Sequence, residues 1–422
     1  MKKNLFMGWL VVVLVSLIFT SAQGKEVDSP KEIILGIPTD VGTLSGRDSF
    51  RAAVLAVEEI NKKGGVKVGN DMLPFRVELA DTRDGSPGVP ISEALLAVEK
   101  LILEKRVNFI VVGSYRSEAI LAQMDIVSKY KIPMLASIVV GPQYTKKIAE
   151  NPKYKYCFRV GIDARGVVTG ILNGLFVLKK KFGFDSAYFI VQDVAWCRAS
   201  ADIIEKVIKQ KGMKVLGYDR VPTGTSQFAS SLTRVKATGA KIIMPIMEMP
   251  EGAILVKQVS SMRIPAVVSG CVGELAGPTA WKTYGDKISG VINVYLEMAN
   301  LPAKKWPRAV AFHEAFKKRW GDDVQISHGP APAYASVYML KSAIERAGSL
   351  NPDAVVQELE QTDYVGLLGR TRFDKKSHQV IYGTDVNKTA IMANAQWSEG
   401  ERVIIFPECV AEGVIALPPS LK

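Results

Sequence analysis

The chain has 422 residues, of which 48% are hydrophobic and 23% are charged, and these values exclude a disordered or collagen-like protein. Lys and Arg number 54 against 42 for Asp and Glu, a net charge of +12 that is spread along the chain, so we expect no nucleic-acid partner. The four cysteines show no Cys-x-x-Cys spacing and there are only three histidines, so we expect no metal site and no cofactor.

The first 24 residues have the order of a secretory signal peptide. Two lysines follow the first methionine, residues 10–19 form an apolar run broken only by one serine, and small residues precede the expected cleavage site after Gly24. A membrane anchor is the alternative, but the run is shorter than the roughly 20 residues that a spanning helix needs. The first cysteine is Cys157, so no lipid is expected at the cleavage site. We therefore expect a protein exported to the periplasm.

From residue 33 onward, short β-rich runs alternate with longer helical patterns, as in βαβ units around a parallel sheet. The first helix ends at Lys62-Lys63-Gly64-Gly65, with cations in its last turn and a glycine for the left-handed cap. The elements predicted for this first α/β lobe are strands 33–37, 75–80, 108–112 and 133–136 and helices 50–60, 91–103 and 117–130.

A second lobe repeats the scheme. Thr39-Asp40-Val41 follows the first strand of one half much as Gln192-Asp193-Val194 follows that of the other, and two similar lobes imply a cleft between them. Its predicted elements are helices 167–181, 199–209 and 228–238 and strands 187–191, 214–218 and 242–246. After strands 267–270 and 290–295, helices 310–319 and 334–347 are expected to return to the first lobe, and strands such as 403–406 to join the second lobe or the hinge. The predicted fold class is α/β.

In open parallel sheets, ligands bind beyond the carboxyl ends of the strands, so the post-strand loops are the candidate site. These loops are 38–46, 113–118, 137–141, 193–198, 247–251 and 270–274. They carry the hydroxyls of Ser114, Ser117 and Ser137, the cation Arg116, the aromatic side chains of Tyr115 and Trp196, and the carboxylates of Glu118, Glu248 and Glu274. A small ligand with both charged and apolar parts suits this set.

Each of these residues also has a purely structural interpretation. Arg116, Glu118 and Glu274 are equally well explained as solvated surface charges, and Ser117 as the cap of the following helix. For Trp196 we favour a place in the cleft over packing beneath a loop, because a large aromatic side chain directly after a strand has few places to be buried.

Catalytic motifs are absent from the sequence. It has no Gly-x-Ser-x-Gly and no His-Glu-x-x-His, and its three histidines are isolated. The run 42–47 lacks the Lys-Ser/Thr pair of a phosphate loop, and the first βα turn lacks Gly-x-Gly-x-x-Gly. We expect a protein that is not an enzyme.

Several short motifs carry a resemblance to a known family. They are Ile34-Leu35-Gly36-Ile37-Pro38, Ile60-Asn61-Lys62-Lys63-Gly64-Gly65, Ala80-Asp81-Thr82-Arg83-Asp84, Val111-Val112-Gly113-Ser114, Phe158-Arg159-Val160, Asp193-Val194-Ala195-Trp196 and Gly369-Arg370-Thr371-Arg372-Phe373-Asp374. On these motifs the sequence resembles the periplasmic leucine/isoleucine/valine-binding protein family, the type I solute-binding components of ABC importers. The resemblance covers nearly all of the mature chain.

The resemblance implies two lobes joined by three crossing segments, near 157–160, 295–298 and 368–371. The implied boundaries are 31–158 plus 297–368 for lobe 1, 159–296 plus 369–405 for lobe 2, and 406–422 for a C-terminal tail. It also implies that the lobes close on a small-molecule ligand, and that the partner is an ABC permease and ATPase complex in the inner membrane. We expect a monomer. A ligand sensor of the same fold with a signalling partner, and an enzyme using the cleft, are the alternatives.

In the amino-acid binders of this family, the first lobe holds the ligand carboxylate and the second lobe holds its ammonium group. Carried over by position, the carboxylate side is Ser114, Tyr115, Arg116, Ser117, Glu118, Ser137, Val139 and Gly141, and the other side is Trp196, Glu248, Val272 and Glu274. The sequence departs from the pattern: Glu118 and Gly141 stand for hydroxyls, Glu248 for an aromatic residue and Val272 for an acid. An aromatic, amide-like or carboxylic ligand is therefore as open as leucine.

An oxidising compartment favours cysteine pairing. Cys157 with Cys409, and Cys197 with Cys271, are the pairs that we consider.

Overall fold

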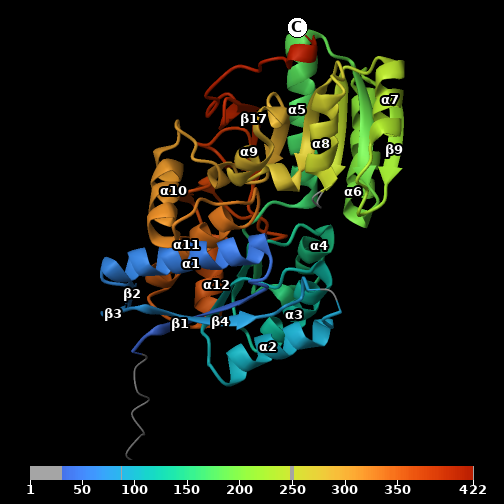
Figure 1. The fold of residues 1–422 in the computed structure, drawn as a ribbon. Coiled ribbons are helices and arrows are strands. Elements are labelled where there is room, and N and C mark those ends of the chain that lie inside the picture. Colours follow the sequence, from blue (N-terminus) through green and yellow to red (C-terminus); the bar gives the residue numbers. More distant parts are fainter. Residues whose placement is uncertain (1–30, 87, 248–250, 422) are drawn as a thin grey trace, which may run out of the picture. The chain divides into compact units, whose positions relative to one another are not determined.

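Two sheets with parallel strands organise the fold (Figure 1). The structure is a computed structural model and describes residues 31–86, 88–247 and 251–421. The expected signal peptide, residues 1–24, lies outside this range. From Glu32 onward the chain forms one compact unit, and both sheets belong to it.

The first sheet has five parallel strands in the order β4-β1-β5-β6-β7. Their bounds are Phe75–Asp81 for β4, Ile33–Thr39 for β1, Phe109–Val112 for β5, Met134–Ala136 for β6 and Cys157–Arg159 for β7. Successive side chains of a strand point to opposite faces, and both faces are covered. Leu35 belongs to an apolar cluster with residues of α1, α10, α11 and α12, whereas Ile110 belongs to one with residues of α2, α3 and α4. These helices are Leu44–Lys62 (α1), Pro307–Trp320 (α10), Pro330–Ala347 (α11), Pro352–Glu360 (α12), Ile91–Leu103 (α2), Ser117–Lys129 (α3) and Pro142–Glu150 (α4).

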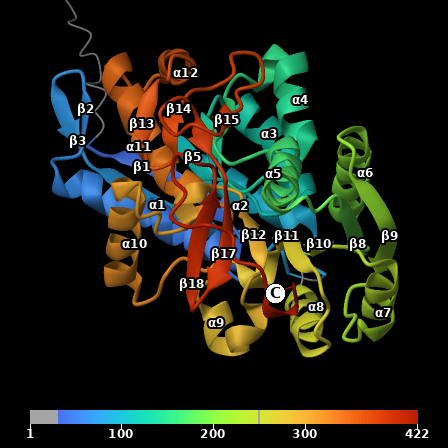
Figure 2. The same cartoon turned by 90° about the horizontal axis from the view of Figure 1, so that it is seen from above.

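The second sheet has seven strands in the order β18-β17-β12-β11-β10-β8-β9. Their bounds are Glu401–Phe406, Ala393–Ser398, Ile292–Tyr295, Val267–Val272, Ile242–Met247, Ser186–Gln192 and Lys214–Val221. The strands from β12 to β9 are parallel, and β17 and β18 add an antiparallel edge beside β12 (Figure 2). One face packs on α5 (Ala164–Phe182) and α6 (Ala195–Gln210). The other packs on α7 (Ala229–Thr238), α8 (Glu251–Ser261) and α9 (Thr279–Tyr284).

Both sheets share one strand order. In the first, the strands run second, first, third, fourth and fifth in chain order, and the parallel part of the second sheet repeats this sequence as β9-β8-β10-β11-β12. The order reverses between β1 and β5 in one sheet and between β8 and β10 in the other. These two switch points are where an open α/β sheet leaves a crevice at its carboxyl edge. The predicted internal repeat is thus present in the topology.

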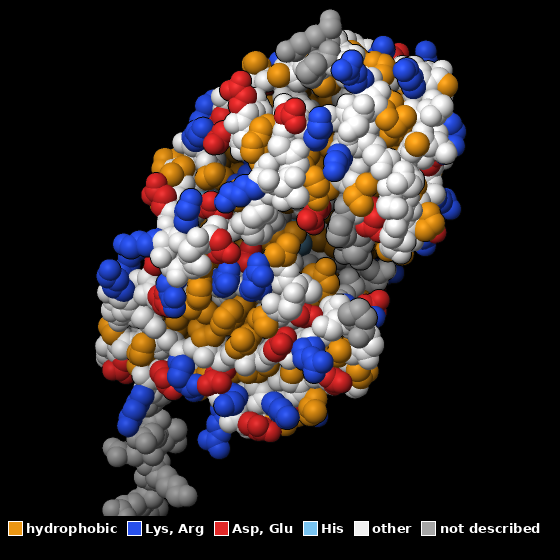
Figure 3. All heavy atoms as spheres, viewed as in Figure 1, with side chains coloured by type: hydrophobic (Ala, Val, Ile, Leu, Met, Phe, Trp, Pro, Cys, Tyr) orange, Lys and Arg blue, Asp and Glu red, His pale blue; other side chains and the backbone are white. Residues whose placement is uncertain are grey.

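Smaller strands complete the chain. β2 (Val66–Val68) and β3 (Asp71–Leu73) form a hairpin, and a four-stranded sheet joins β13 (Tyr364–Gly366), β14 (Gly369–Thr371), β16 (Ala390–Ile391) and β15 (Tyr382–Gly383). The segment 368–371, which the resemblance assigns to a crossing, includes β14 of this small sheet. Lys and Arg side chains are scattered over the face seen in Figure 3, in keeping with a charge spread along the sequence.

Segments that link the two sheets meet at one buried carboxylate. Glu297, which follows β12, accepts hydrogen bonds from the Ile162 N–H at 3.1 Å, the Gly329 N–H at 3.2 Å and the Asn300 amide at 3.0 Å. His328 Nδ1 lies 2.8 Å from the same carboxylate. A buried carboxylate with four partners is well compensated for its lost hydration, so this group fixes the link after β7 against the link after β12.

The predicted cysteine pairs are wrong, because none of the four cysteines is in a disulfide. Cys157 lies in β7 and is fully buried, whereas Cys409 is exposed and donates from Sγ to the Thr384 carbonyl. Cys197 is buried in α6 and Cys271 is half-buried in β11. Burial raises the pKa of Cys157 to about 12, which leaves it a thiol at neutral pH.

Within the described residues, no helix is long and apolar enough to cross a membrane.

Candidate functional site

The loops that follow β1, β4 and β5 converge at the switch point of the first sheet. The carboxylate of Asp40, after β1, accepts from the Gly85 N–H at 2.6 Å. Asp84 accepts from the N–H groups of Tyr115 at 3.3 Å and Arg116 at 2.6 Å. A side chain at Gly85 would approach Thr43 to 2.7 Å, so only glycine leaves the three loops this close. Two buried carboxylates therefore hold these loops: Asp40 holds the loop after β4, and Asp84 holds the loop after β5.

This arrangement occupies hydrogen-bond donors that the sequence analysis assigned to ligand binding. The backbone N–H groups of Tyr115 and Arg116 are engaged by Asp84, and the Ser114 hydroxyl donates to Gln123 at 2.9 Å. Sequence reasoning missed Asp84 and Gln123 as hydrogen-bond partners. Asp84 lies 31 positions from Tyr115 and Gln123 lies nine from Ser114, and neither contact leaves a local pattern. The donors that remain at this edge lie further along the loop.

Those donors belong to the first turn of α3. Arg116 is the N-cap of this helix and contributes no capping hydrogen bond, and Ser117 is its first helical residue. The interpretation of Ser117 as a helix cap is therefore wrong. The first N–H that bonds back into the helix is that of Ile120, so the N–H groups of the first turn point out of it. An uncapped N-terminus of this kind attracts anions.

Helix α4 begins beside α3. Its N-cap is Gly141, which also provides no side-chain cap, and a Cβ placed on Gly141 would lie 3.5 Å from Ser117 Oγ. Ser137 is buried and its hydroxyl lies 3.5 Å from that of Ser336, while Val139 belongs to the apolar core below α2, α3 and α4. Two uncapped helix starts and the Ser117 hydroxyl thus lie together at the carboxyl edge of the first sheet.

The two remaining charged residues of the loop face solvent. The side chains of Arg116 and Glu118 are 42% and 64% exposed, and Arg116 Nε lies 3.6 Å from the Glu118 carboxylate. A pair this exposed contributes little to stability. The Arg116 guanidinium remains available to a ligand, because an exposed ion pair is easily broken.

The carboxyl edge of the second sheet carries Trp196 and a buried carboxylate. Trp196 is the second residue of α6, is half-buried, and packs against the apolar cluster beneath α5 and α6. Val140, from the loop before α4, packs against the same cluster. The two edges therefore share a contact region. The N-cap of α6 is Val194, whose side chain has no oxygen to accept a capping hydrogen bond.

Glu251 is the acid that the structure brings to this switch point. It is 7% exposed, receives a hydrogen bond from the Gly224 N–H, and lies 3.5 Å from the amide nitrogen of Gln192 at the end of β8. The sequence analysis predicted Glu248, from the same loop, as a site residue. Glu248 lies outside the described residues. No local signal separates the two glutamates, because both follow β10 within four positions.

The last two predicted residues lie at the end of β11. Val272 is buried in the core below α7, α8 and α9, and its N–H donates to Asn293 at 2.8 Å. Glu274 is exposed, and partial desolvation raises the pKa of its carboxyl. Leu275 and Ala276, just beyond, accept from the Tyr295 hydroxyl, at 3.5 and 2.9 Å. Val272 thus has a structural role, and Glu274 remains at the rim.

A buried arginine lies behind the first edge. Arg159, at the end of β7, donates from Nη1 to the Gly141 carbonyl at 2.8 Å and from Nη2 to Thr145 at 3.2 Å, and it also donates to Gln379. Burial lowers its pKa to about 10 and the nearby Asp163 opposes this, so the side chain stays charged. It fixes the loop before α4 to the linking segments.

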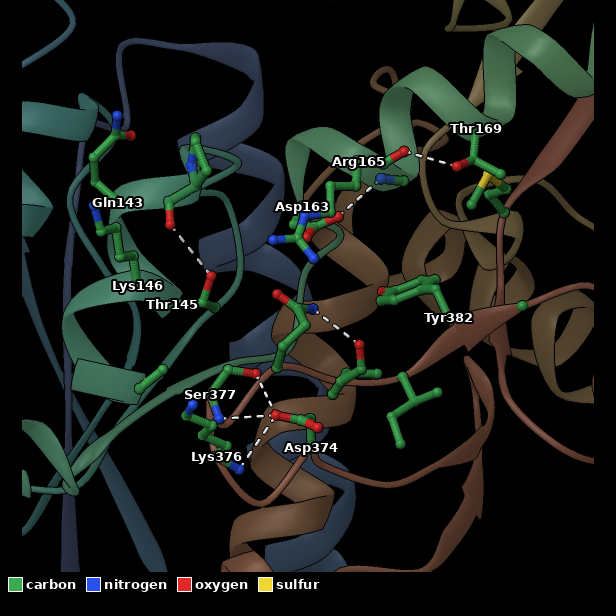
Figure 4. A pocket seen from close by; sticks show the side chains of 18 of the residues that line it. Gln143, Thr145, Lys146, Asp163, Arg165, Thr169, Asp374, Lys376, Ser377 and Tyr382 are labelled. Carbon is green, nitrogen blue, oxygen red and sulfur yellow. Dashed lines mark hydrogen bonds between the residues drawn. The ribbon is translucent and has the colours of Figure 1, made fainter. Parts of the chain in front are cut away.

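A cavity of about 790 Å³ lies on the other side of this arginine, between α4, α5 and residues 374–384 (Figure 4). None of the eleven predicted site residues that the structure describes lines it. Among the described residues, no group of three His, Cys, Asp or Glu side chains is arranged to hold a metal ion.

Comparison with known proteins gives consistent results. A family model described as "Periplasmic binding protein" matches residues 39–394. A Leu/Ile/Val-binding protein homolog 7 of Brucella melitensis is 24% identical over 382 residues, which are 89% of this chain and 90% of the relative. A crystal structure from Silicibacter pomeroyi has a TM-score of 0.79 at 18% identity and covers 92% of this chain and all of that one.

Two similar structures contain ligands. A branched-chain amino acid transporter substrate binding protein of Streptococcus pneumoniae in complex with isoleucine has a TM-score of 0.66 and 20% identity, covering 88% of this chain and 98% of that one. A solute binding protein of an ABC transporter from R. palustris in complex with benzoate has a TM-score of 0.65 and 12% identity, covering 89% and 95%. These likenesses support the same fold.

Proposed function

Because the chain belongs to the periplasmic binding protein family, we propose that it captures a small carboxylate-bearing organic solute between the carboxyl edges of its two parallel sheets. It then delivers the solute to an ABC permease and its ATPase. The proposal includes export with removal of residues 1–24 and action as a monomer. Its two lobes are 31–158 plus 297–368 and 159–296 plus 369–405, and they close on the ligand.

One observation carries the choice of a carboxylate. Helices α3 and α4 start side by side at the switch edge of the first sheet, and neither start is capped by a side chain of the described residues. The N–H groups of an uncapped first turn, together with the helix dipole, bind an anion favourably. Ser117 Oγ lies next to both helix starts and adds a donor.

The second edge supplies the other half of the site in this proposal. Trp196 gives a flat apolar face for the body of the ligand, since its ring is only half-buried. Glu251 gives a buried carboxylate within reach of Gln192, suited to a ligand ammonium group. Amino acids would use both residues and aromatic acids only Trp196, and relatives of this fold include one with isoleucine and one with benzoate.

Closure follows from contacts made by the two edges. A ligand that touches both edges binds the closed state more tightly, and this difference in affinity is what shifts the equilibrium toward closure. Glu297 joins the two linking segments near the axis of this motion, because it holds both Ile162 and Gly329.

A thermal-shift screen tests the proposal. The panel is branched and aromatic amino acids, aromatic acids, amides, polyamines and sugars, applied to the exported chain from residue 25. A ligand at a hundredfold excess over its Kd stabilises the folded state by about 2.7 kcal/mol, which a melting curve resolves. We expect hits among molecules that carry a carboxylate and an apolar or aromatic body. A panel in which only sugars or polyamines stabilise the protein would contradict the proposal.

A further inference from the structure

The cavity behind Arg159 has no role in the proposed function. Its volume of about 790 Å³ lies within the range of small-molecule sites, which is roughly 300 to 1,000 Å³. Three separate segments form its walls: α4, the first half of α5, and residues 374–384. Figure 4 shows the side chains of Thr145, Asp163 and Tyr382 around the space between these segments. The cavity is therefore large enough for an organic molecule.

Its carboxylates are already engaged by the protein. Asp163 accepts from the Gly166 N–H at 2.8 Å as the cap of α5. Asp374 accepts from the Ser377 hydroxyl at 2.6 Å and from the backbone N–H groups of Lys376 and Ser377 at 3.2 and 2.9 Å. These oxygens hold the cavity walls in place. They leave little acceptor capacity for a ligand cation.

Its cations are not engaged in the same way. Arg165 and Lys376 line the cavity from α5 and from the loop after β14, and neither forms an ion pair with any residue in the described ranges. Lys146, on α4, lies 3.9 Å from Glu150 in an exposed pair. The three walls thus each present one basic side chain, and two of the three have no carboxylate partner among those residues.

An uncharged hydrogen-bond donor adds to the two basic side chains that have no carboxylate partner. Asn173 lines the cavity from α5, and its side-chain nitrogen is buried without a hydrogen-bond partner in the described part of the chain. A buried donor without a partner is unfavourable, so a ligand acceptor that reaches it gains a hydrogen bond that the protein does not make itself. Among the ionised side chains of the cavity, Arg165 and Lys376 are the ones without a partner in the described ranges, because the third carboxylate that lines it, Glu150, pairs with Lys146.

We propose that this cavity binds a small oxyanion, a carboxylate or a phosphate, through Arg165 and Lys376, with the Asn173 amide as a further donor. The planar guanidinium of Arg165 can hold two oxygens of either group at once. Because α4 packs on the first sheet and α5 on the second, the bound anion touches helices of both. This site is separate from the one at the carboxyl edges of the strands.

Titration calorimetry at constant ionic strength tests the proposal, with inorganic phosphate and succinate as separate probes and succinamide as the uncharged control. We expect saturable binding of phosphate, succinate or both, and none of succinamide. Arg165→Gln and Lys376→Gln should each weaken that binding about tenfold or more, the usual loss for one charge-assisted hydrogen bond. Phosphate alone, or succinate alone, identifies which source of the oxyanion the site accepts.

Lys236→Gln is the matched control. Lys236 is an exposed lysine on α7, so the variant loses the same charge without touching the cavity. It should bind the probe like the wild type. The proposal is overturned if neither anion binds saturably, or if Arg165→Gln and Lys376→Gln, verified as folded by circular dichroism, bind as well as Lys236→Gln. Solutes bound at the strand edges should be unaffected by all three variants, which separates this test from that of the proposed function.

Discussion

Glu251 Oε2 lies 3.5 Å from the side-chain amide nitrogen of Gln192, across the switch point between β10 and β8. The carboxylate is buried, and its other oxygen receives the Gly224 N–H. A buried acid at this edge has two polar partners and no cation among the described residues. In the proposed function, a ligand ammonium group lies beside the Glu251 carboxylate as the missing cation.

Glu251→Gln should therefore weaken binding of an amino acid by about 1.5 to 3 kcal/mol, the value of a hydrogen bond to a charged group. Binding of an aromatic acid without an ammonium group should be unchanged. Calorimetry with one ligand of each kind measures both effects. Glu314→Gln, at an exposed glutamate of α10, is the control. Equal losses for both ligands would mean that Glu251 acts on the fold and not on the ammonium group.

Trp196→Ala should weaken the best ligand of the screen by about 1 to 3 kcal/mol, the range for losing apolar contact. Because the ring is only half-buried, the melting temperature of the free protein should fall by little. Calorimetry and a melting curve on the same sample separate the two effects. Unchanged affinity for a ligand that clearly binds would remove Trp196 from the site.

The fold was predictable from the sequence wherever the pattern was long. Helix α2 begins and ends where the apolar spacing predicts, at 91 and 103, and every predicted strand lies within or beside an observed one. The nine-residue helices α4 and α12 and the β2–β3 hairpin were not predicted. Each helix offers fewer than three turns of periodic positions, and short elements owe their stability to tertiary packing.

The site was predictable only as a set of loops. The strand ends indicated which edge of each sheet carries the candidate site, but the sequence did not predict the hydrogen-bond partners of individual side chains. Asp84 takes the backbone donors of the loop after β5, and Gln123 takes the Ser114 hydroxyl, in contacts that only the folded chain creates. The predicted start of α3 at Ser117 is confirmed, but the alternative interpretation of Ser117 as its cap differs by a single position, and the uncapped start depends on that position.

The His328–Glu297 pair should make stability depend on pH. Burial lowers the pKa of His328, but the charge of Glu297 and its hydrogen bond outweigh this, and the net pKa is raised from 6.5. A pKa raised on folding gives stability that is full below the unfolded value of 6.5 and is lost as pH rises through the folded value.

His328→Gln tests this pH dependence. The wild type should exceed the variant in free energy of unfolding by about 1 to 3 kcal/mol near pH 6, and by less above the raised pKa. Urea denaturation at several pH values measures the difference. Two further histidines are buried: His313, whose pKa burial lowers to about 3, and His378, whose pKa burial also lowers. Both are present in the two proteins, so their effects cancel. A difference that does not vary with pH would contradict the assignment.

The cysteines should all titrate as thiols. With a chromogenic disulfide reagent, the native protein should show one fast group, Cys409, because it is the exposed cysteine. Cys157 should react only after denaturation, since it is buried and its pKa is raised to about 12. We expect four thiols in denaturant without reductant. A total of two or none would mean that the protein contains one or two disulfides.

The most direct test of the account is a crystal structure with the best ligand of the screen. We expect the ligand carboxylate within hydrogen-bond distance of the first-turn N–H groups of α3 and of the Ser117 hydroxyl, with its apolar body against Trp196. Electron density for that ligand only in the cavity between α4 and α5, or at any place away from both strand edges, would contradict the central claim.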